Sequence, residues 1–344
     1  MRKNYDKRLE NLNKRRYDEL IKKAILSESF HSENFGKSTK YVFESMREID
    51  SKYTSNTFEA SEKIQKHLRD GLSEIGIIVD FEHQGSVPMN THIKLHSDID
   101  LVTLHGGFYS LEPPLEPAIP YNGDPIVDLR KLREESFKIL NNIYDQVDNS
   151  NSKSIAVYPT QPKRKVDVVQ ANWFDSIEYV NNNREKKFRG FSIFDYHLKT
   201  RKTDFPLLNI FNIIEKDTWV RGALRRSIRF LKTLKVDAEY EIKLSSYEIS
   251  TIVYNIEEYY LNKPEKQTLL LLPIISNHLN EIITNKNFRD NLKSANDKEF
   301  VFKGCNDAKV LEIKKLKREV DEIIEDLKEE LSPLYKSIEN EIVY

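Results

Sequence analysis

The chain has 344 residues, and its 54 Lys and Arg side chains nearly balance 55 Asp and Glu, so its overall charge does not favour strong binding to nucleic acid or to anionic membranes. A single cysteine, Cys305, excludes an intrachain disulfide and a zinc site built from several thiolates. The longest apolar run, 268–275, is far shorter than the ~20 residues of a membrane-spanning helix, and no apolar segment follows the charged N-terminus, so we expect a cytoplasmic protein.

The first two hundred residues mix helical and strand patterns. Apolar residues at helical spacing predict helices over 1–30, 57–75 and 127–147. Short runs rich in β-branched residues predict strands over 77–81, 98–104, 154–159 and 165–171. The segment 106–125 is dense in proline and glycine, and we interpret it as a surface excursion.

From Leu207 onward the apolar periodicity is helical, and strand patterns nearly disappear. The predicted helices are 207–235, 246–262, 265–285 and 306–340, and Pro333 is expected to kink or end the last of them. This change near Pro206 predicts an α+β protein with two domains. Residues 1–206 would form a mixed sheet with its N-terminal helices, and residues 207–344 an α-helical lobe.

Three aspartates in the predicted strands carry the strongest chemical signal. Residues i and i+2 of a strand point to the same face, so Asp98 and Asp100 project their carboxylates side by side. Such carboxylates repel each other unless a cation lies between them, and their oxygens suit Mg²⁺. Asp167 lies in another apolar strand, where an inward acid needs a charge partner. We predict that the three acids hold two Mg²⁺ ions, for which Mn²⁺ can substitute, and that Asp167 holds the second ion and can also act as general base.

A Gly-Ser pair precedes the first two acids. Gly85 lets the backbone approach a phosphate, and the exposed N–H groups with the Ser86 hydroxyl can bind its oxygens. Together, GS, SDID and the distant acid of KVDVV resemble the nucleotidyltransferase superfamily typified by DNA polymerase β. That superfamily combines a Gly-Ser turn, an acid-x-acid strand and a distant third acid.

Within that superfamily, THIKLHSDIDLV, VDVVQA and KLSSYEIS are similar to tracts of the cyclic GMP-AMP synthase and oligoadenylate synthase branch, which includes the bacterial CD-NTases of anti-phage signalling. The resemblance implies that Ser246 contacts the triphosphate and that Tyr247 stacks on a base. It also implies that a lysine of the basic helix binds the donor phosphates, with Lys232 the first choice and Lys235 the second. The alternatives are a helix N-cap at Ser246, a core position for Tyr247 and a solvated basic face.

The resemblance implies a synthase that binds NTPs in a cleft between its lobes, releases pyrophosphate and forms cyclic or short linear oligonucleotides. A separate effector protein would then sense the product. One alternative is a transferase that adds nucleotides to tRNA or to a protein, and another is a non-catalytic nucleotide sensor. Retention of three costly acids argues against the sensor.

Two further positions bear on nucleotide choice. Gln170 and Asn172 follow the third acid and are candidates to read a base edge. His96 stands before the Ser of SDID, where the family usually has a small residue, often Gly. We expect this bulky residue to reshape the loop that covers the donor nucleotide.

Overall fold

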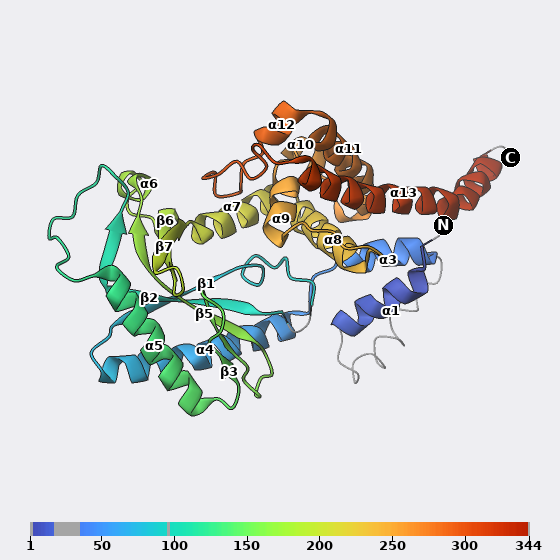
Figure 1. Ribbon diagram of the computed structural model, residues 1–344. Coiled ribbons are helices and arrows are strands. Elements are labelled where there is room, and N and C mark those ends of the chain that lie inside the picture. Colours follow the sequence, from blue (N-terminus) through green and yellow to red (C-terminus); the bar gives the residue numbers. More distant parts are fainter. Residues whose placement is uncertain (1–2, 17–34, 95–96, 343–344) are drawn as a thin grey trace. The chain divides into compact units, whose positions relative to one another are not determined.

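The computed structural model describes residues 3–16, 35–94 and 97–342. The chain divides into two compact units (Figure 1). The helical unit comprises Met1–Glu48, Ile93–Leu95 and Ile213–Tyr344, and the sheet unit comprises Ile49–His92 and His96–Asn212. One mixed sheet with flanking helices and a set of C-terminal helices confirm the predicted α+β fold class.

The sheet unit is built around a seven-stranded sheet with the order β1-β2-β5-β4-β3, in which β6 pairs with β5 and β7 with β6. Only β2 and β5 run parallel, and the other described pairs are antiparallel. The parallel pairing places the first residues of β2 and β5 side by side. The strands are β1 (Val79–Gln84), β2 (Ile99–Leu111), β3 (Val147–Asp148), β4 (Ile155–Val157), β5 (Val166–Asp175), β6 (Arg189–Asp195) and β7 (Thr200–Asp204).

Helices α4 (Ser51–Glu74) and α5 (Pro125–Ile143) pack on one face of this sheet, over an apolar cluster that includes Val168. Alternate residues of the same strands point to the other face. There they form a second, smaller cluster that includes Val102 and Val169. The sheet is therefore apolar on both faces. The remaining helical elements of the unit are α6 (Ile177–Asn181), the 3-10 helix η2 (Lys186–Phe188) and the start of α7 (Pro206–Trp219).

The helical unit combines both ends of the chain. None of the helices in the described ranges is long and apolar enough to cross a membrane. Its helices, besides the end of α7, are α1 (Tyr5–Arg16), α3 (Lys37–Met46), α8 (Ala223–Asp237), α9 (Ser246–Tyr254), α10 (Glu258–Leu261), the 3-10 helix η3 (Glu265–Leu270), α11 (Leu271–Thr284), α12 (Lys286–Asp290) and α13 (Asp307–Ile342).

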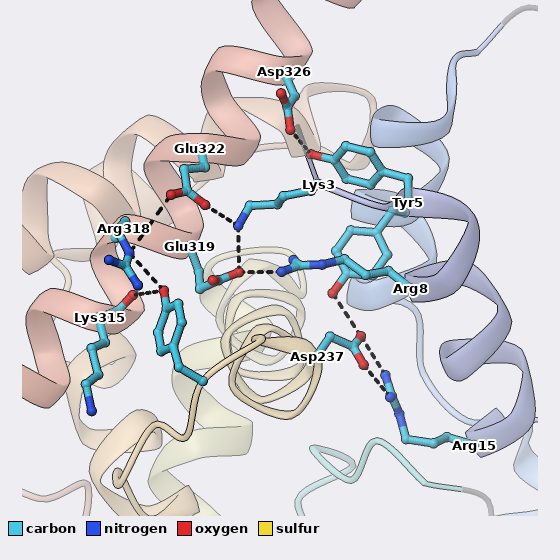
Figure 2. A network of polar contacts seen from close by, with 12 residues as sticks. Lys3, Tyr5, Arg8, Arg15, Asp237, Lys315, Arg318, Glu319, Glu322 and Asp326 are labelled. Atoms are coloured by element: carbon cyan, nitrogen blue, oxygen red, sulfur yellow. Dashed lines mark hydrogen bonds and ion pairs between the residues drawn. The ribbon is translucent and has the colours of Figure 1, made fainter. Parts of the chain in front are cut away.

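A largely buried set of ion pairs attaches the N-terminal segment to α8 and α13 (Figure 2). Arg8 Nη2 lies 2.6 Å from Glu319 Oε2, and Lys3 Nζ lies 2.8 Å from the same oxygen. Arg15 donates to both oxygens of Asp237, at 2.5 and 2.8 Å. We call these five residues the α1 network. Each of its two carboxylates has at least one cationic partner.

The α1 network explains a difference from the predicted domain division, which grouped residues 1–206 together. In the structure, α1 and α3 belong to the helical unit. The periodicity of a charged helix indicates that a helix forms, but it does not indicate what that helix contacts. Here the partner of Arg8 is 311 residues away in the sequence.

The helix predicted over 207–235 is two helices, α7 and α8. It is interrupted because Arg221 and Gly222 adopt positive φ angles of 56° and 80°, a conformation in which a helix cannot continue. Asp217 accepts a hydrogen bond from the backbone N–H of Arg225 at 2.8 Å, which satisfies one of the free donors at the start of α8.

Several other boundaries differ from the predicted ones. The strand β2 continues to Leu111, into the segment interpreted as an excursion, with an irregularity in its pairing between His105 and Tyr109. The hairpin of β6 and β7 was not predicted, and α13 does not end at Pro333. The helix predicted over 1–30 is confirmed over Tyr5–Arg16, and the rest of that prediction falls mainly outside the described residues.

Candidate active site

Asp98, Asp100 and Asp167, which we call the acidic cluster, lie where β2 and β5 begin. Asp98 directly precedes β2, and Asp100 stands opposite Asp167 in the parallel pairing. Asp100 is two residues from Val102, and Asp167 is two residues from Val169, so both acids lie on the face opposite α4 and α5. The structure therefore brings the three predicted acids together on one face and at one end of the sheet.

The acidic cluster holds repelling charges at close range. Burial, together with the negative charges of Asp167 and Asp98, raises the pKa of Asp100 to about 7. Lys165 opposes this effect from the position just before β5. Its Nζ lies 2.6 Å from Asp167 Oδ2 and 3.2 Å from Asp98 Oδ2. The cluster has three carboxylates around this ammonium group.

The Gly-Ser turn adjoins the acidic cluster, because β1 ends at Gln84, which pairs with Asp100. Gly85 has a φ of +86°, and a Cβ atom built on it would lie 2.6 Å from Asp100 Oδ2. Glycine is therefore required here both by the backbone conformation and by the close approach of the carboxylate. The carbonyl oxygen of Ser86 accepts a hydrogen bond from the N–H of Thr91 at 3.0 Å, which closes the turn.

The acidic cluster fits a divalent cation in its chemistry. Its side chains offer only hard oxygen ligands, which Mg²⁺ and Mn²⁺ prefer. The repulsion felt by Asp100 is of the kind that a bound cation relieves. Within the described ranges, however, no group of three or more acidic, histidine or cysteine side chains is arranged ready to hold a metal ion. The ammonium of Lys165 lies between two of the carboxylates instead.

The two candidate base-reading residues have a different environment. Gln170 and Asn172 stand an odd number of residues after Asp167 on β5, so their side chains lie on the opposite face of the sheet. Both are fully buried. The Gln170 side-chain oxygen accepts a hydrogen bond from Arg133 at 3.4 Å, and the Asn172 side-chain oxygen accepts one from Arg201 at 3.0 Å. Their predicted role at a base edge is wrong, because these amides serve the interior of the sheet unit.

In the helical unit, Lys232 is only 8% exposed. Burial, together with the positive charges of Arg229, Lys235 and Lys94, lowers its pKa to about 8. Like charges gathered around a buried ammonium favour a bound anion. The phosphate-binding role of a lysine on α8 stays a prediction, and the structure adds Lys94, which the sequence reasoning did not single out, to the charges around Lys232.

Other basic residues of α8 have structural partners. Arg229 Nε donates to the carbonyl oxygen of Met46 at 2.8 Å, and Arg225 forms an ion pair with Asp217. Lys235 lines a cavity of about 610 Å³ formed with the loop between α8 and α9. The basic face of α8 is thus neither fully solvated nor wholly available to a ligand.

The start of α9 distinguishes two neighbouring serines. Ser245 is the N-cap, since its hydroxyl accepts from the N–H of Glu248 at 3.1 Å and its own N–H donates to the Glu248 carboxylate at 2.7 Å. The alternative of an N-cap at Ser246 is therefore wrong. Ser246 is exposed, and Tyr247 is half-buried. Neither residue is among those that line the cavity beside Lys235.

Sequence reasoning also missed Lys165, although a signal was present. In RKVDVV, Lys165 stands two residues before Asp167, so the alternation that placed Asp167 places Lys165 on the same face. His96, expected to reshape the donor loop, lies outside the described residues.

Comparison with known proteins identifies the family. Residues 211–327 match the model of the cGAS/DncV-like nucleotidyltransferase C-terminal helical domain. A c-di-GMP synthase from Flavobacteriaceae sp. is 35% identical over 83% of this chain and 84% of the relative. Another, from Capnocytophaga granulosa, is 34% identical over 95% of this chain and 98% of the relative. The chain belongs to the CD-NTase family.

Solved structures agree with this assignment. The STING-associated CdnE c-di-GMP synthase from Flavobacteriaceae sp. has a TM-score of 0.82 at 31% identity, covering 95% of this chain and 99% of the other. A CdnE c-UMP-AMP synthase from Rhodothermus marinus shares the fold, with a TM-score of 0.62 at 14% identity, covering 82% of this chain and 94% of the other. This CD-NTase is a nucleotidyltransferase of the class that makes cyclic oligonucleotide second messengers, a family that uses divalent metal. The resemblance to the CD-NTases and the enzyme class that the sequence indicated are confirmed.

Proposed function

We propose that this CD-NTase joins two GTP molecules into cyclic di-GMP. The proposal rests on three curated relatives, 34–35% identical, each described as a c-di-GMP synthase. Two structures similar to this chain are described as STING-associated c-di-GMP synthases. We therefore also propose that a separate effector protein senses the product.

The acidic cluster is the proposed catalytic site. Asp98, Asp100 and Asp167 would hold two Mg²⁺ ions, for which Mn²⁺ can substitute, and such ions supply charge to the triphosphate and lower the pKa of the attacking hydroxyl. Asp167 orients that hydroxyl and accepts its proton. Gly85 and Ser86 offer backbone N–H groups and a hydroxyl to the phosphate oxygens, a role supported by their place beside Asp100.

The reaction proceeds in two equivalent transfers. A ribose 2′- or 3′-hydroxyl oxygen of one nucleotide attacks the α-phosphorus of the other. The bond between that phosphorus and the bridging oxygen breaks, and pyrophosphate departs with the bonding electrons. The second transfer, within the linear intermediate, closes the ring and releases a second pyrophosphate.

The helical unit supplies the proposed nucleotide-binding side chains. Lys232, with Lys235 as the second choice, binds donor phosphates, and the gathered positive charge around Lys232 supports this role. Ser246 is exposed, as a contact to a triphosphate requires. Tyr247 is half-buried, and stacking of a base on its ring would contribute about 1–3 kcal/mol.

Incubation of the full chain with labelled NTPs and Mg²⁺, singly and mixed, tests this function. After phosphatase treatment, chromatography should show one resistant product that forms from GTP alone. Asp98→Ala combined with Asp100→Ala should form none. A resistant product that requires a second base would overturn the assignment of GTP, and only phosphatase-sensitive products would overturn cyclisation. Label transferred to added tRNA or to protein would favour the alternative transferase.

A further inference from the structure

Lys165 is held in a fixed position beside the acidic cluster. Its carbonyl oxygen accepts a hydrogen bond from the N–H of Ile99 at 3.3 Å, which joins the start of β5 to the start of β2. The side chain spans the gap between the strands, with Nζ 2.6 Å from Asp167 Oδ2 and 3.2 Å from Asp98 Oδ2. It therefore bridges the first and the third acid.

The Lys165 ammonium occupies the place from which a metal ion shared by Asp98 and Asp167 would neutralise these two carboxylates. A divalent ion and an ammonium that contact the same oxygens repel each other strongly at such distances. Lysine carries a compact charge on a flexible stem, and this side chain is 28% exposed, so it can move toward solvent while its backbone stays paired. The site can therefore exchange one cation for another without a change in the sheet.

We propose that Lys165 is a built-in counterion, which holds Asp98 and Asp167 together before metal binds and which the metal must displace. This inference rests on the metal site of the proposed function. Lys165 is thus a positioning residue that sets how much divalent metal the enzyme requires. It also accounts for the absence, within the described residues, of a cluster arranged ready to hold a metal.

The test is Mn²⁺ binding to the full chain without nucleotide, measured from the electron paramagnetic resonance signal of free Mn²⁺. Lys165→Met should lower the Kd of the tightest Mn²⁺ site by about tenfold or more, because the competing charge is gone. Lys165→Arg keeps the charge and should bind Mn²⁺ like the wild type. Lys163→Met is the matched control, since Lys163 is exposed and stands two residues earlier, and its Kd should stay within about twofold.

Thermal unfolding gives a second measurement. In EDTA, Lys165→Met should unfold at a lower temperature than the wild type, because the carboxylates have lost their cation. Added Mn²⁺ should then raise its Tm by more than it raises that of the wild type. If Lys165→Met does not fold, Lys165→Gln retains a hydrogen-bond donor and should show the same tighter Mn²⁺ binding.

Two failures can be told apart. A Kd for Mn²⁺ that is unchanged or higher in Lys165→Met and Lys165→Gln would overturn the counterion proposal, because the ion pairs would then be merely structural. If the combined Asp98→Ala and Asp100→Ala change removes no Mn²⁺ site from the wild type, the metal site of the proposed function is wrong and the inference falls with it.

Discussion

The α1 network and the acidic cluster differ in how their charges are matched. In the α1 network, the side chains of Glu319 and Asp237 are buried, and each receives close hydrogen bonds from at least one cationic side chain (Figure 2). In the acidic cluster, three carboxylates gather around the single ammonium of Lys165, and Asp100 is left with a raised pKa. The first set pairs its charges within the fold, whereas the second holds repulsion that the proposed divalent cation would relieve.

The largest effect is expected from Asp167→Asn in the acidic cluster. Bond formation should slow by roughly 10³-fold, about 4 kcal/mol, because the hydroxyl loses its proton acceptor and part of its metal ligation. Donor affinity should change little, since this carboxylate serves the attacking group. Calorimetry with a non-hydrolysable GTP analogue measures that affinity. If it falls as far as in Asp98→Asn, the proposed division of roles is wrong.

The next largest effect is expected from Arg8→Met in the α1 network. Loss of this guanidinium leaves the Glu319 carboxylate, which is almost fully buried, with Lys3 as its remaining cationic partner, and the free energy of unfolding should fall by about 1.5–3 kcal/mol. Denaturant unfolding measures it. Lys14→Met on the same helix removes an exposed ion pair with Glu10 and should cost less than about 1 kcal/mol. Equal losses in the two variants would refute a stabilising role for the network.

A smaller effect is expected from Lys232→Met. The affinity for a GTP analogue should fall by about tenfold, close to 1.4 kcal/mol, while the Tm stays the same or rises because a buried like charge is gone. Lys243→Met, at an exposed position in the same unit, is the control. A large drop in Tm with unchanged affinity would make Lys232 a structural residue.

An effect of similar size, which vanishes at low pH, is expected from Asp100→Asn. The folded-state pKa of Asp100 is about 7, above its ordinary value of 3.8, so between these values the folded chain keeps a proton that the unfolded chain loses. The contribution of the Asp100 carboxyl group to the stability of the fold therefore decreases as the pH rises from about 4 to about 7. In EDTA, Asp100→Asn should be more stable than wild type by roughly 1–3 kcal/mol near pH 8 and about equal to it near pH 4. A gain independent of pH would contradict this origin.

The alternation of side chains along a strand predicts more of this site than the three acids alone. Alternation along a strand placed Asp98 with Asp100, and the structure brings Asp167 to the same face. The same rule, applied one step further, places Gln170 on the other face, and it places Lys165 beside Asp167. Those two results were available from the sequence.

Other features depend on contacts that no local pattern contains. The partner of Arg8 lies on α13, and the charges around Lys232 come partly from Lys94 in a distant loop. The break between α7 and α8 depends on the positive φ angles at Arg221 and Gly222, within an otherwise continuous apolar periodicity. Tertiary packing decides these features, and a periodicity that describes one element at a time does not include it.

We propose that the acidic cluster serves chemistry and not stability. The most direct measurement is pyrophosphate release from GTP and Mg²⁺ by the Asp98→Ala, Asp100→Ala double variant, with circular dichroism to verify its fold. We predict release below about 1% of the wild-type rate from a fully folded chain, because lost metal ligation removes several kcal/mol of transition-state stabilisation. Release above that level from a folded variant would contradict the assignment of the acidic cluster as the catalytic site.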